Sequence, residues 1–253
     1  MDSIELIEVL KKEYECNFSG WDFSHLNGRM IEDPLPWSYT DIIYEYMKNS
    51  NCMLDMGTGG GEFLDSLSNL PNEVFATEGY EPNIVLARKK LANKKIEVKV
   101  VKEDGILNFN NCLFDLIINR HESYNVNELF RVLKPDSYFI TQQVGGMNDY
   151  NINSYLGALQ PKYFNWCLAK TIEELYKAGF SIIKKREAVG KTRFFDIKSI
   201  VYYLKCIPWQ IEDFSIDKYF GRLKILNEII IDQGYIDFLN HRFIVIAQKN
   251  KTL

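Results

Sequence analysis

Residues 53–62 read MLDMGTGGGE, so a short apolar run leads directly into a turn with glycines at Gly57, Gly59 and Gly61. This context predicts a buried strand, a tight turn and then a helix. Glycine allows a ligand to approach the backbone closely, because no side chain stands in the way. The stretch therefore predicts a ligand site at the carboxyl end of the strand.

The residue after the turn restricts the class of ligand. No Gly-Lys-Ser/Thr sequence follows, so the turn is not a phosphate-binding P-loop. Glu62 takes the place of the third glycine of the dinucleotide pattern, and a carboxylate at a helix start would repel a pyrophosphate. An NAD-dependent oxidoreductase is thus an alternative that the turn disfavours.

Strand and helix patterns alternate along the chain. Strands are predicted over 51–56, 73–77, 96–101, 114–119, 138–144, 180–186 and 241–248, and helices over 2–15, 41–48, 62–70, 83–92, 126–133 and 171–179. This order predicts a Rossmann-like α/β fold, with a mainly parallel sheet and helices on both faces. The simplest organisation is one domain over 1–253, with an N-terminal helical lid over 1–48 and a mostly helical, aromatic cap insertion over 191–240.

The run over 53–62 resembles the first motif of class I S-adenosylmethionine-dependent methyltransferases of the small-molecule, type 11-like kind. The segment FDLIIN over 114–119, followed by LFRVLKP over 129–135, resembles the fourth-strand and fifth-helix signature of that family. The resemblance covers 51–144 well and the last two strands loosely. It implies methyl transfer, S-adenosyl-L-methionine as cofactor, and a seven-stranded sheet whose last strand runs antiparallel.

Acidic residues lie at or just after the ends of the first three predicted strands of the sheet. Asp55, Glu78 and Asp104 all lie at strand ends on the edge where such folds bind ligands. The resemblance implies that Asp55 and the glycine turn hold the methionyl part, Glu78 the ribose and Asp104 the adenine edge. Asn119 is expected to contact the cofactor from the fourth strand. Arg29 is expected to bind the methionyl carboxylate, although packing against the following helix explains that N-terminal stretch equally well.

The methyl acceptor is expected beside the ends of the fourth and fifth strands. His121 is the best candidate for a general base, because the ordinary pKa of histidine is about 6.5. Arg120 is the second catalytic candidate, as a binder of a substrate anion. Gln143, Tyr202 and Trp209 are candidate substrate-binding residues. The alternatives are that His121 fills a loop, that Arg120 pairs with a nearby acid, and that the aromatic residues form a satellite core.

Composition restricts partners and location. The 253 residues carry a net charge of −4, which disfavours nucleic acid without excluding it. A small-molecule acceptor is therefore expected, and RNA methylation is the less favoured reading. No apolar run approaches the roughly 20 residues that a membrane helix needs, so no membrane association is expected.

Metal-binding and redox signals are weak in the sequence. Its three histidines are dispersed and its five cysteines form no CxxC pair, so no metal site is predicted. An odd number of cysteines indicates reduced thiols and a cytoplasmic location. The remaining alternative is a non-catalytic module that binds S-adenosylmethionine. The methyl acceptor and the oligomeric state are not readable from the sequence.

Overall fold

The computed structural model describes residues 2–18, 21–102 and 104–250. Residues 1 and 19–20 of the predicted lid lie outside the described residues, whereas the predicted cap over 191–240 is described in full. The chain forms two compact units, which are described separately. Unit 1 consists of Met1–Leu35, Gly145–Trp166 and Ala188–Arg242. Unit 2 consists of Pro36–Val144, Cys167–Glu187 and Phe243–Leu253.

Unit 2 contains the parallel strands that the sequence predicts. These are β2 (Cys52–Met56), β3 (Glu73–Glu78), β4 (Glu97–Val100), β5 (Phe114–Arg120) and β6 (Leu133–Val144). β2 pairs with β3 on one side and β5 on the other, and both pairings are parallel. The carboxyl ends of β2, β3 and β5 therefore lie next to one another, as the sequence predicts.

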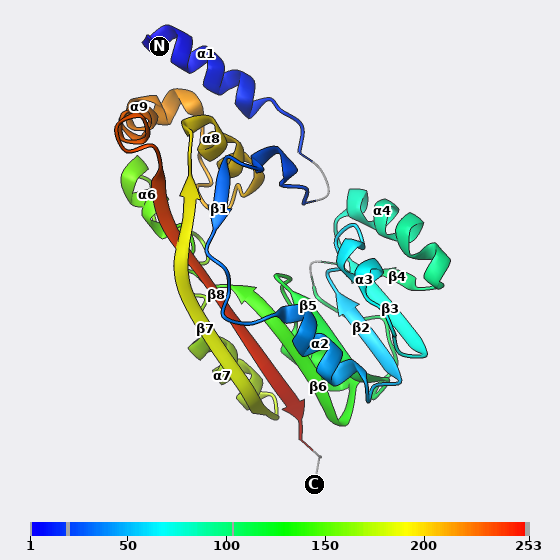
Figure 1. Ribbon diagram of the computed structural model, residues 1–253. Coiled ribbons are helices and arrows are strands. Elements are labelled where there is room, and N and C mark those ends of the chain that lie inside the picture. The colour runs from blue at the N-terminus through cyan, green and yellow to red at the C-terminus, as the bar shows by residue number, and fades with distance from the viewer. Residues whose placement is uncertain (1, 19–20, 103, 251–253) are drawn as a thin grey trace. The chain divides into compact units, whose positions relative to one another are not determined.

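Helices cover both faces of this sheet. They are α2 (Tyr39–Met47), α3 (Glu62–Ser66), α4 (Glu81–Leu91), the 3₁₀ turn η2 (Ala92–Lys94), α5 (Val126–Val132) and α7 (Leu168–Lys177). In Figure 1, α2 lies in front of β5 and β6, whereas α7 lies behind the sheet. β2 is buried along its whole length, as expected of a central strand covered on both faces.

Two long strands pass through both units. β7 (Phe180–Phe194) and β8 (Ile236–Lys249) lie between β1 (Met30–Glu32) and β6 in the strand order β1-β7-β8-β6-β5-β2-β3-β4. Figure 1 shows that β8 runs opposite to β7 and β6, which confirms the predicted antiparallel last strand. The expected number of seven strands is wrong, because the described residues form eight.

The eighth strand comes from the N-terminal stretch. β1 pairs antiparallel with β7, with Met30 opposite Phe194 and Glu32 opposite Thr192. Three residues inside an irregular Gly- and Pro-rich stretch carry no alternation of their own, so a sequence pattern cannot reveal them. The partner segment was also missed, because β7 continues to Phe194 rather than ending at Arg186.

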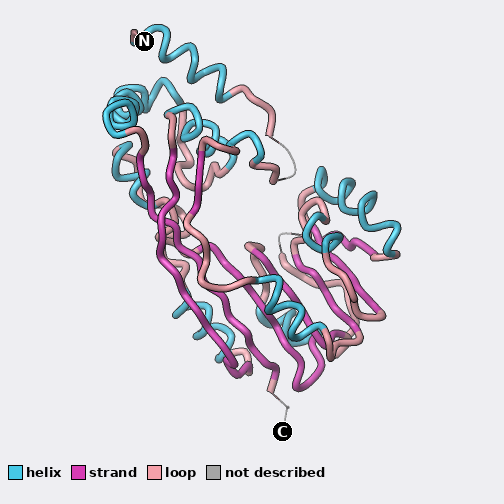
Figure 2. Tube along the Cα trace, in the orientation of Figure 1, coloured by secondary structure: helices cyan, strands magenta, loops and turns pink. Residues whose placement is uncertain are grey.

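Unit 1 is built from helices around the remaining parts of these strands. They are α1 (Ser3–Tyr14), the 3₁₀ turn η1 (Ser24–Leu26), α6 (Tyr150–Leu156), α8 (Ile197–Cys206) and α9 (Ile216–Gln233), drawn as cyan tubes in Figure 2. Their apolar faces share one core that includes Leu10, Tyr202, Leu223 and Phe238. Segment 191–240 is therefore helical only over 197–206 and 216–233, and α6 is an element that the sequence did not predict.

The irregular start of β6 has a local cause. β5 pairs with Leu133 and then again from Tyr138, with a register shift between the two. Asp136 lies in that shift with a φ of 61°. The predicted start at Tyr138 is thus the start of the regular ladder. Within the described ranges, the helices are all too short or too polar to cross a bilayer.

Candidate functional site

The glycine turn joins β2 to α3 in unit 2. Gly57, Gly59 and Gly61 have φ values of +65°, +62° and +86°, in the left-handed region that favours glycine. The backbone N–H of Thr58 donates to the carbonyl of Thr77 at 2.9 Å, and this bond fixes the turn against β3. The predicted helix after the turn is present but ends at Ser66.

The three glycines are needed for different reasons. A Cβ on Gly57 would lie 2.5 Å from the Cβ of Glu122, and a Cβ on Gly61 would lie 3.1 Å from the side chain of Leu91 on α4. A Cβ on Gly59 would meet nothing within 4 Å. Gly57 and Gly61 therefore serve packing, and Gly59 is the point where a ligand can reach the backbone of the turn.

Glu78 connects the turn to the loop after β3. Its Oε2 accepts from the N–H of Gly59 at 2.7 Å, and its Oε1 accepts from the N–H groups of Gly79 and Tyr80, each at 2.9 Å. A carboxylate offers about four acceptor positions, so three are already used by the backbone. A ligand hydroxyl at Glu78 must take the remaining position or replace the N–H of Gly59.

Asp55 is the buried carboxyl at the end of β2. Burial raises its pKa to about 7, and the nearby Glu78 charge acts in the same direction. The Thr58 hydroxyl and the Arg120 guanidinium oppose this shift. Asp55 therefore lies in an environment that disfavours its negative charge and that a bound cation would relieve.

Glu122 is a site residue that the sequence reasoning missed. It follows β5, and its side chain packs against Gly57. Burial raises its pKa, and the charge of Glu78 adds to the effect. Asp55, Glu78 and Glu122 thus gather three carboxyl groups around the glycine turn. The signal in the sequence that could have found it is its position just after the fourth predicted strand.

Asn119 and Gln143 lie together at the ends of β5 and β6. Asn119 is fully buried, and its Oδ1 accepts from the Thr141 hydroxyl at 3.0 Å and from Nε2 of Gln143 at 2.8 Å. Nε2 of Gln143 also donates to the carbonyl of Glu122 at 3.0 Å. Among the described residues, Nδ2 of Asn119 has no hydrogen-bond partner. A buried donor of this kind indicates that a ligand or water acceptor belongs beside it.

The two catalytic candidates follow Asn119 directly. Arg120 is exposed, with its guanidinium 5.4 Å from the centre of the Phe63 ring. His121 has a φ of +66°, and its backbone N–H donates to the carbonyl of Gln142 at 2.8 Å. Its Nε2 lies 3.3 Å from the Gln142 amide, whose Oε1 accepts from the indole N–H of Trp37 at 2.8 Å. His121 is thus held at the end of β5 with an exposed ring.

Asp104 lies in the loop after β4, as predicted. Its side chain is exposed, and Oδ1 accepts from the N–H of Ile106 at 3.1 Å. The role of Asp104 at an adenine edge stays a prediction.

Three of the predicted site residues belong to unit 1. The Arg29 guanidinium donates to both carboxylate oxygens of Asp196, at 2.9 and 2.8 Å, and to Glu13 at 2.8 Å. These ion pairs give Arg29 a structural role within unit 1. Tyr202 is almost fully buried in the unit 1 core, whereas Trp209 is 37% exposed. Pocket-lining roles for Tyr202 and Trp209 stay predictions.

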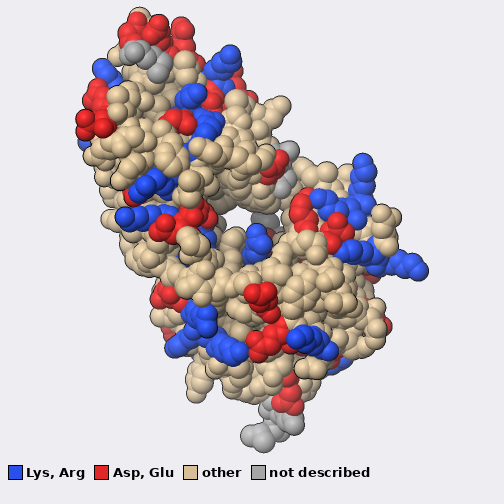
Figure 3. Space-filling view, viewed as in Figure 1, with Lys and Arg blue, Asp and Glu red and all other residues tan. Residues whose placement is uncertain are grey.

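Segment 88–102 is rich in lysine and arginine, and some of these side chains form ion pairs within unit 2. Lys90 lies 2.6 Å from the carboxylate of Glu62, and Lys94 lies 3.4 Å from that of Asp65. Figure 3 shows basic and acidic side chains interspersed over this part of unit 2. Such mixed charge is typical of a solvated helix face rather than of a nucleic-acid groove.

A separate hollow lies at the opposite edge of the sheet. It measures about 380 Å³ and is lined by residues at the amino ends of β5 and β6, including Asp115 and Ser137. Ligands of open α/β sheets bind outside the carboxyl ends of the strands. The hollow is therefore not the site formed by the glycine turn.

Comparisons with known proteins agree with this geometry. Residues 54–141 match the family model described as a methyltransferase domain. No curated protein sequence matches the chain. Solved structures with the same fold are known. Their sequence identities to this chain are so low that the likeness shows a shared fold and nothing more.

One similar structure is a protein from Bacillus halodurans C-125, provisionally assigned as a methyltransferase; it is 15% identical, with a TM-score of 0.60 over 85% of this chain and 100% of that one. Another is a SAM-dependent methyltransferase from Aquifex aeolicus, which is 18% identical with a TM-score of 0.50 over 98% of both chains. A third is the [4+2]-cyclase SpnF, which is 13% identical with a TM-score of 0.53 over 98% of this chain and 95% of that one. Residues 54–141 are therefore similar to a methyltransferase domain, and the chain has a Rossmann-like fold that it shares with these solved structures.

Proposed function

We propose that the chain is an S-adenosylmethionine-dependent methyltransferase that acts on a small molecule. The observation that carries the proposal is the open approach to Gly59, in a turn that Glu78 contacts at Gly59, Glu122 at Gly57 and Asp55 at Thr58. Burial raises the pKa values of Asp55 and Glu122, and a site with such carboxyl groups is suited to a ligand with positive charge. S-adenosylmethionine carries such charge on its sulfonium and its ammonium group.

The residues present fit this cofactor. Gly59 leaves its backbone open, and Glu78 has one acceptor position left for a ribose hydroxyl. Asn119 offers a buried amide donor without a protein partner, which suits a carboxylate or hydroxyl oxygen of the ligand. Asp55 is placed to balance the positive charge, and Asp104 is the proposed contact for the adenine edge.

When bound, S-adenosylmethionine supplies a methyl group that is already activated for in-line displacement. The protein then has to orient the acceptor and exclude water, and orientation alone can contribute about 7–11 kcal/mol to lowering the barrier. His121 is the proposed base that takes the acceptor proton, because its exposed ring stands at the end of β5. Arg120 is the proposed binder of an anionic group on the acceptor.

A second function deserves a direct test because the fold is shared with the [4+2]-cyclase SpnF. A protein of this fold need not therefore be a methyltransferase. The open space at Gly59 is equally consistent with a protein that binds the cofactor but does not transfer its methyl group. The NAD-dependent alternative is disfavoured by Glu62, which stands at the first position of α3, where a pyrophosphate would have to bind.

Two measurements separate these functions. Calorimetry with S-adenosylmethionine, S-adenosylhomocysteine and NAD identifies the ligand, and we expect binding of the first two only. Incubation of a metabolite pool with methyl-labelled S-adenosylmethionine then detects transfer. Binding without labelled product, in a pool that supports a known methyltransferase, would favour the non-methylating function. Binding of NAD alone would refute the proposal. A cytoplasmic location also stays a prediction.

A further inference from the structure

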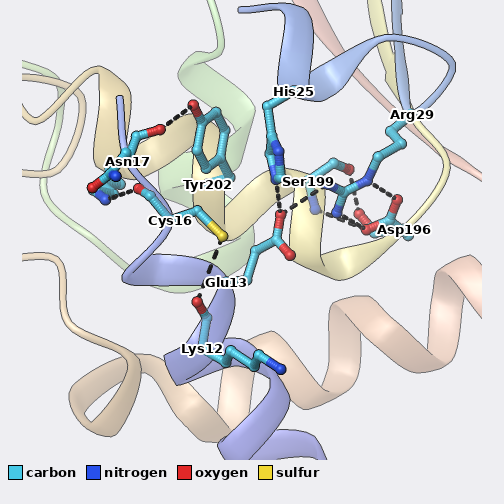
Figure 4. A network of polar contacts seen from close by, with 10 residues as sticks. Lys12, Glu13, Cys16, Asn17, His25, Arg29, Asp196, Ser199 and Tyr202 are labelled. Atoms are coloured by element: carbon cyan, nitrogen blue, oxygen red, sulfur yellow. Dashed lines mark hydrogen bonds and ion pairs between the residues drawn. The ribbon is translucent and has the colours of Figure 1, made fainter. Parts of the chain in front are cut away.

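Three side chains with metal-binding atoms meet at the end of α1 in unit 1. The ligand atoms of Glu13, Cys16 and His25 all lie within 4.8 Å of one another. Figure 4 shows them converging beside Arg29 and Tyr202. We propose that Glu13, Cys16 and His25 form a binding site for Zn²⁺, separate from the glycine turn.

Local structure brings the three residues together. Glu13 lies in the last turn of α1, and Cys16 follows two residues after the helix ends, where its backbone N–H donates to the carbonyl of Glu13 at 3.2 Å. η1 returns the chain to this end of the helix and presents His25. The ring centroids of His25 and Tyr202, on α8, lie 4.3 Å apart, and this contact supports the imidazole. The ligands thus come from two segments that a third helix supports.

The distances require only a small adjustment. Nε2 of His25 lies 2.7 Å from Oε1 of Glu13. Tetrahedral zinc, with bonds of about 2.0–2.3 Å, places its ligand atoms roughly 3.3–3.6 Å apart. Sγ of Cys16 lies 3.7 Å from the carbonyl of Lys12, and this contact is weak enough for the thiol to turn toward the other two side chains.

The residue types at the site indicate which metal ion it would bind. A thiolate and an imidazole favour zinc over magnesium or calcium, which prefer oxygen ligands. Three protein ligands leave a fourth position for water. Side-chain exposure is 11% for Glu13 and 38% for His25, so the position is sheltered on one side and reachable from solvent on the other.

The guanidinium of Arg29 lies beside the two ligand atoms of Glu13 and His25. Its Nη1 lies 2.8 Å from Oε1 of Glu13 and 3.1 Å from Nε2 of His25. Its Nε and Nη2 are paired with Asp196, so a metal ion needs to displace Nη1 alone and leaves that pair intact. With Cys16 ionised, the negative charges of Cys16, Glu13 and Asp196 balance Arg29 and one divalent cation.

Binding of zinc at this site is coupled to release of a proton. The Cys16 thiol loses its proton to solvent when the sulfur–zinc bond forms, so uptake of zinc releases a proton.

The test uses the full chain after treatment with a chelator. Calorimetric titration with Zn²⁺ is expected to show one ion per chain. Co²⁺ as a spectroscopic probe is expected to show thiolate-to-cobalt charge transfer. Cys16→Ser and His25→Asn should each weaken zinc binding at least tenfold, whereas Cys112→Ser, at an exposed cysteine of unit 2, should leave it unchanged.

A measurement on the unmodified chain guards against variants that misfold. Zn²⁺ should protect Cys16, but not Cys112, from alkylation as measured by mass spectrometry. Absence of stoichiometric zinc uptake would overturn the proposal. Equal zinc affinity in the folded Cys16→Ser and His25→Asn variants, or alkylation of Cys16 that zinc does not slow, would do the same. None of these readouts depends on methyl transfer.

Discussion

The carboxylate of Glu78 accepts a hydrogen bond of 2.7 Å from the backbone N–H of Gly59. This contact joins the acid at the end of β3 to the one glycine of the turn that faces open space. The residue proposed to bind the ribose thus also shapes the backbone at which the ligand arrives. Substitutions at the two positions should therefore affect ligand binding in different ways.

Removal of the Glu78 carboxylate should weaken binding of S-adenosylhomocysteine. Glu78→Ala is expected to cost about 1–3 kcal/mol of binding free energy, because buried hydroxyl and N–H donors lose their acceptor. Calorimetry measures the change, with Glu81→Ala on the exposed start of α4 as the control. Unchanged affinity in a folded Glu78→Ala variant would contradict the assigned role.

A side chain at Gly59 should block the ligand without a clash inside the protein. Gly59→Val is expected to abolish binding, because its side chain would project into the approach that the turn leaves open. The left-handed backbone adds strain of roughly 1–2 kcal/mol. Gly234→Val is the matched control, because Gly234 also has positive φ and open surroundings, in unit 1. If the Gly59→Val variant retains normal affinity for S-adenosylhomocysteine, the assigned cofactor site is wrong.

Local signals made much of unit 2 predictable. The strand before Gly57 and the apolar strand over 114–119 carry patterns that depend on neighbours in sequence, so their prediction was confirmed. β1 was missed because its ladder depends on Phe194 and Thr192, far along the chain. Glu122 was missed because its place over Gly57 follows from the left-handed turn at His121. The ion pair of Arg29 with Asp196 joins residues 167 positions apart, which no local pattern reveals.

Affinity for S-adenosylmethionine should depend on pH through Asp55. The pKa of Asp55 is raised to about 7 by burial, so the carboxyl of the free protein takes up a proton below that pH. A cationic ligand favours the ionised form, and its affinity should fall by up to about tenfold per pH unit below 7. S-adenosylhomocysteine lacks the sulfonium charge and should show a shallower slope.

Calorimetry from pH 5.5 to 8.5 measures both slopes. Asp55→Asn cannot ionise and should flatten the dependence for S-adenosylmethionine while leaving a smaller contribution from Glu122, whose pKa is also raised. Equal slopes for the two ligands would show that the carboxyl groups do not respond to the sulfonium.

Turnover should depend on His121 more than cofactor affinity does. His121→Asn is suitable because asparagine tolerates the positive φ of this position. Loss of a general base is expected to lower kcat about 10²- to 10⁴-fold, with binding of S-adenosylhomocysteine unchanged. Stopped assays on the acceptor found in the labelling screen give kcat. A variant with full kcat would leave His121 as a residue that only completes the loop.

A buried acid in unit 1 should make stability depend on pH. Asp149 is fully buried, and its Oδ2 accepts from the Tyr203 hydroxyl at 2.8 Å. Among the described residues, its Oδ1 has no hydrogen-bond partner. Burial raises the pKa of Asp149 from the usual 3.8 to about 7, although Tyr203 and Arg242 oppose the shift.

The direction of the effect follows from proton binding. Between pH 4 and 7 the folded state holds a proton on Asp149 that the unfolded state has released, so the free energy of unfolding falls as pH rises through this window. Asp149→Asn imitates the protonated carboxyl, and asparagine accepts the left-handed backbone at φ 53°. The variant should match the parent chain near pH 4 and exceed its stability at pH 8, by on the order of 2–4 kcal/mol. Urea unfolding at several pH values measures the difference, with Asp232→Asn on the exposed face of α9 as the control. A stability difference between variant and parent that stays constant from pH 4 to 8 would show that Asp149 is ionised throughout, held by Tyr203 and Arg242 despite its burial.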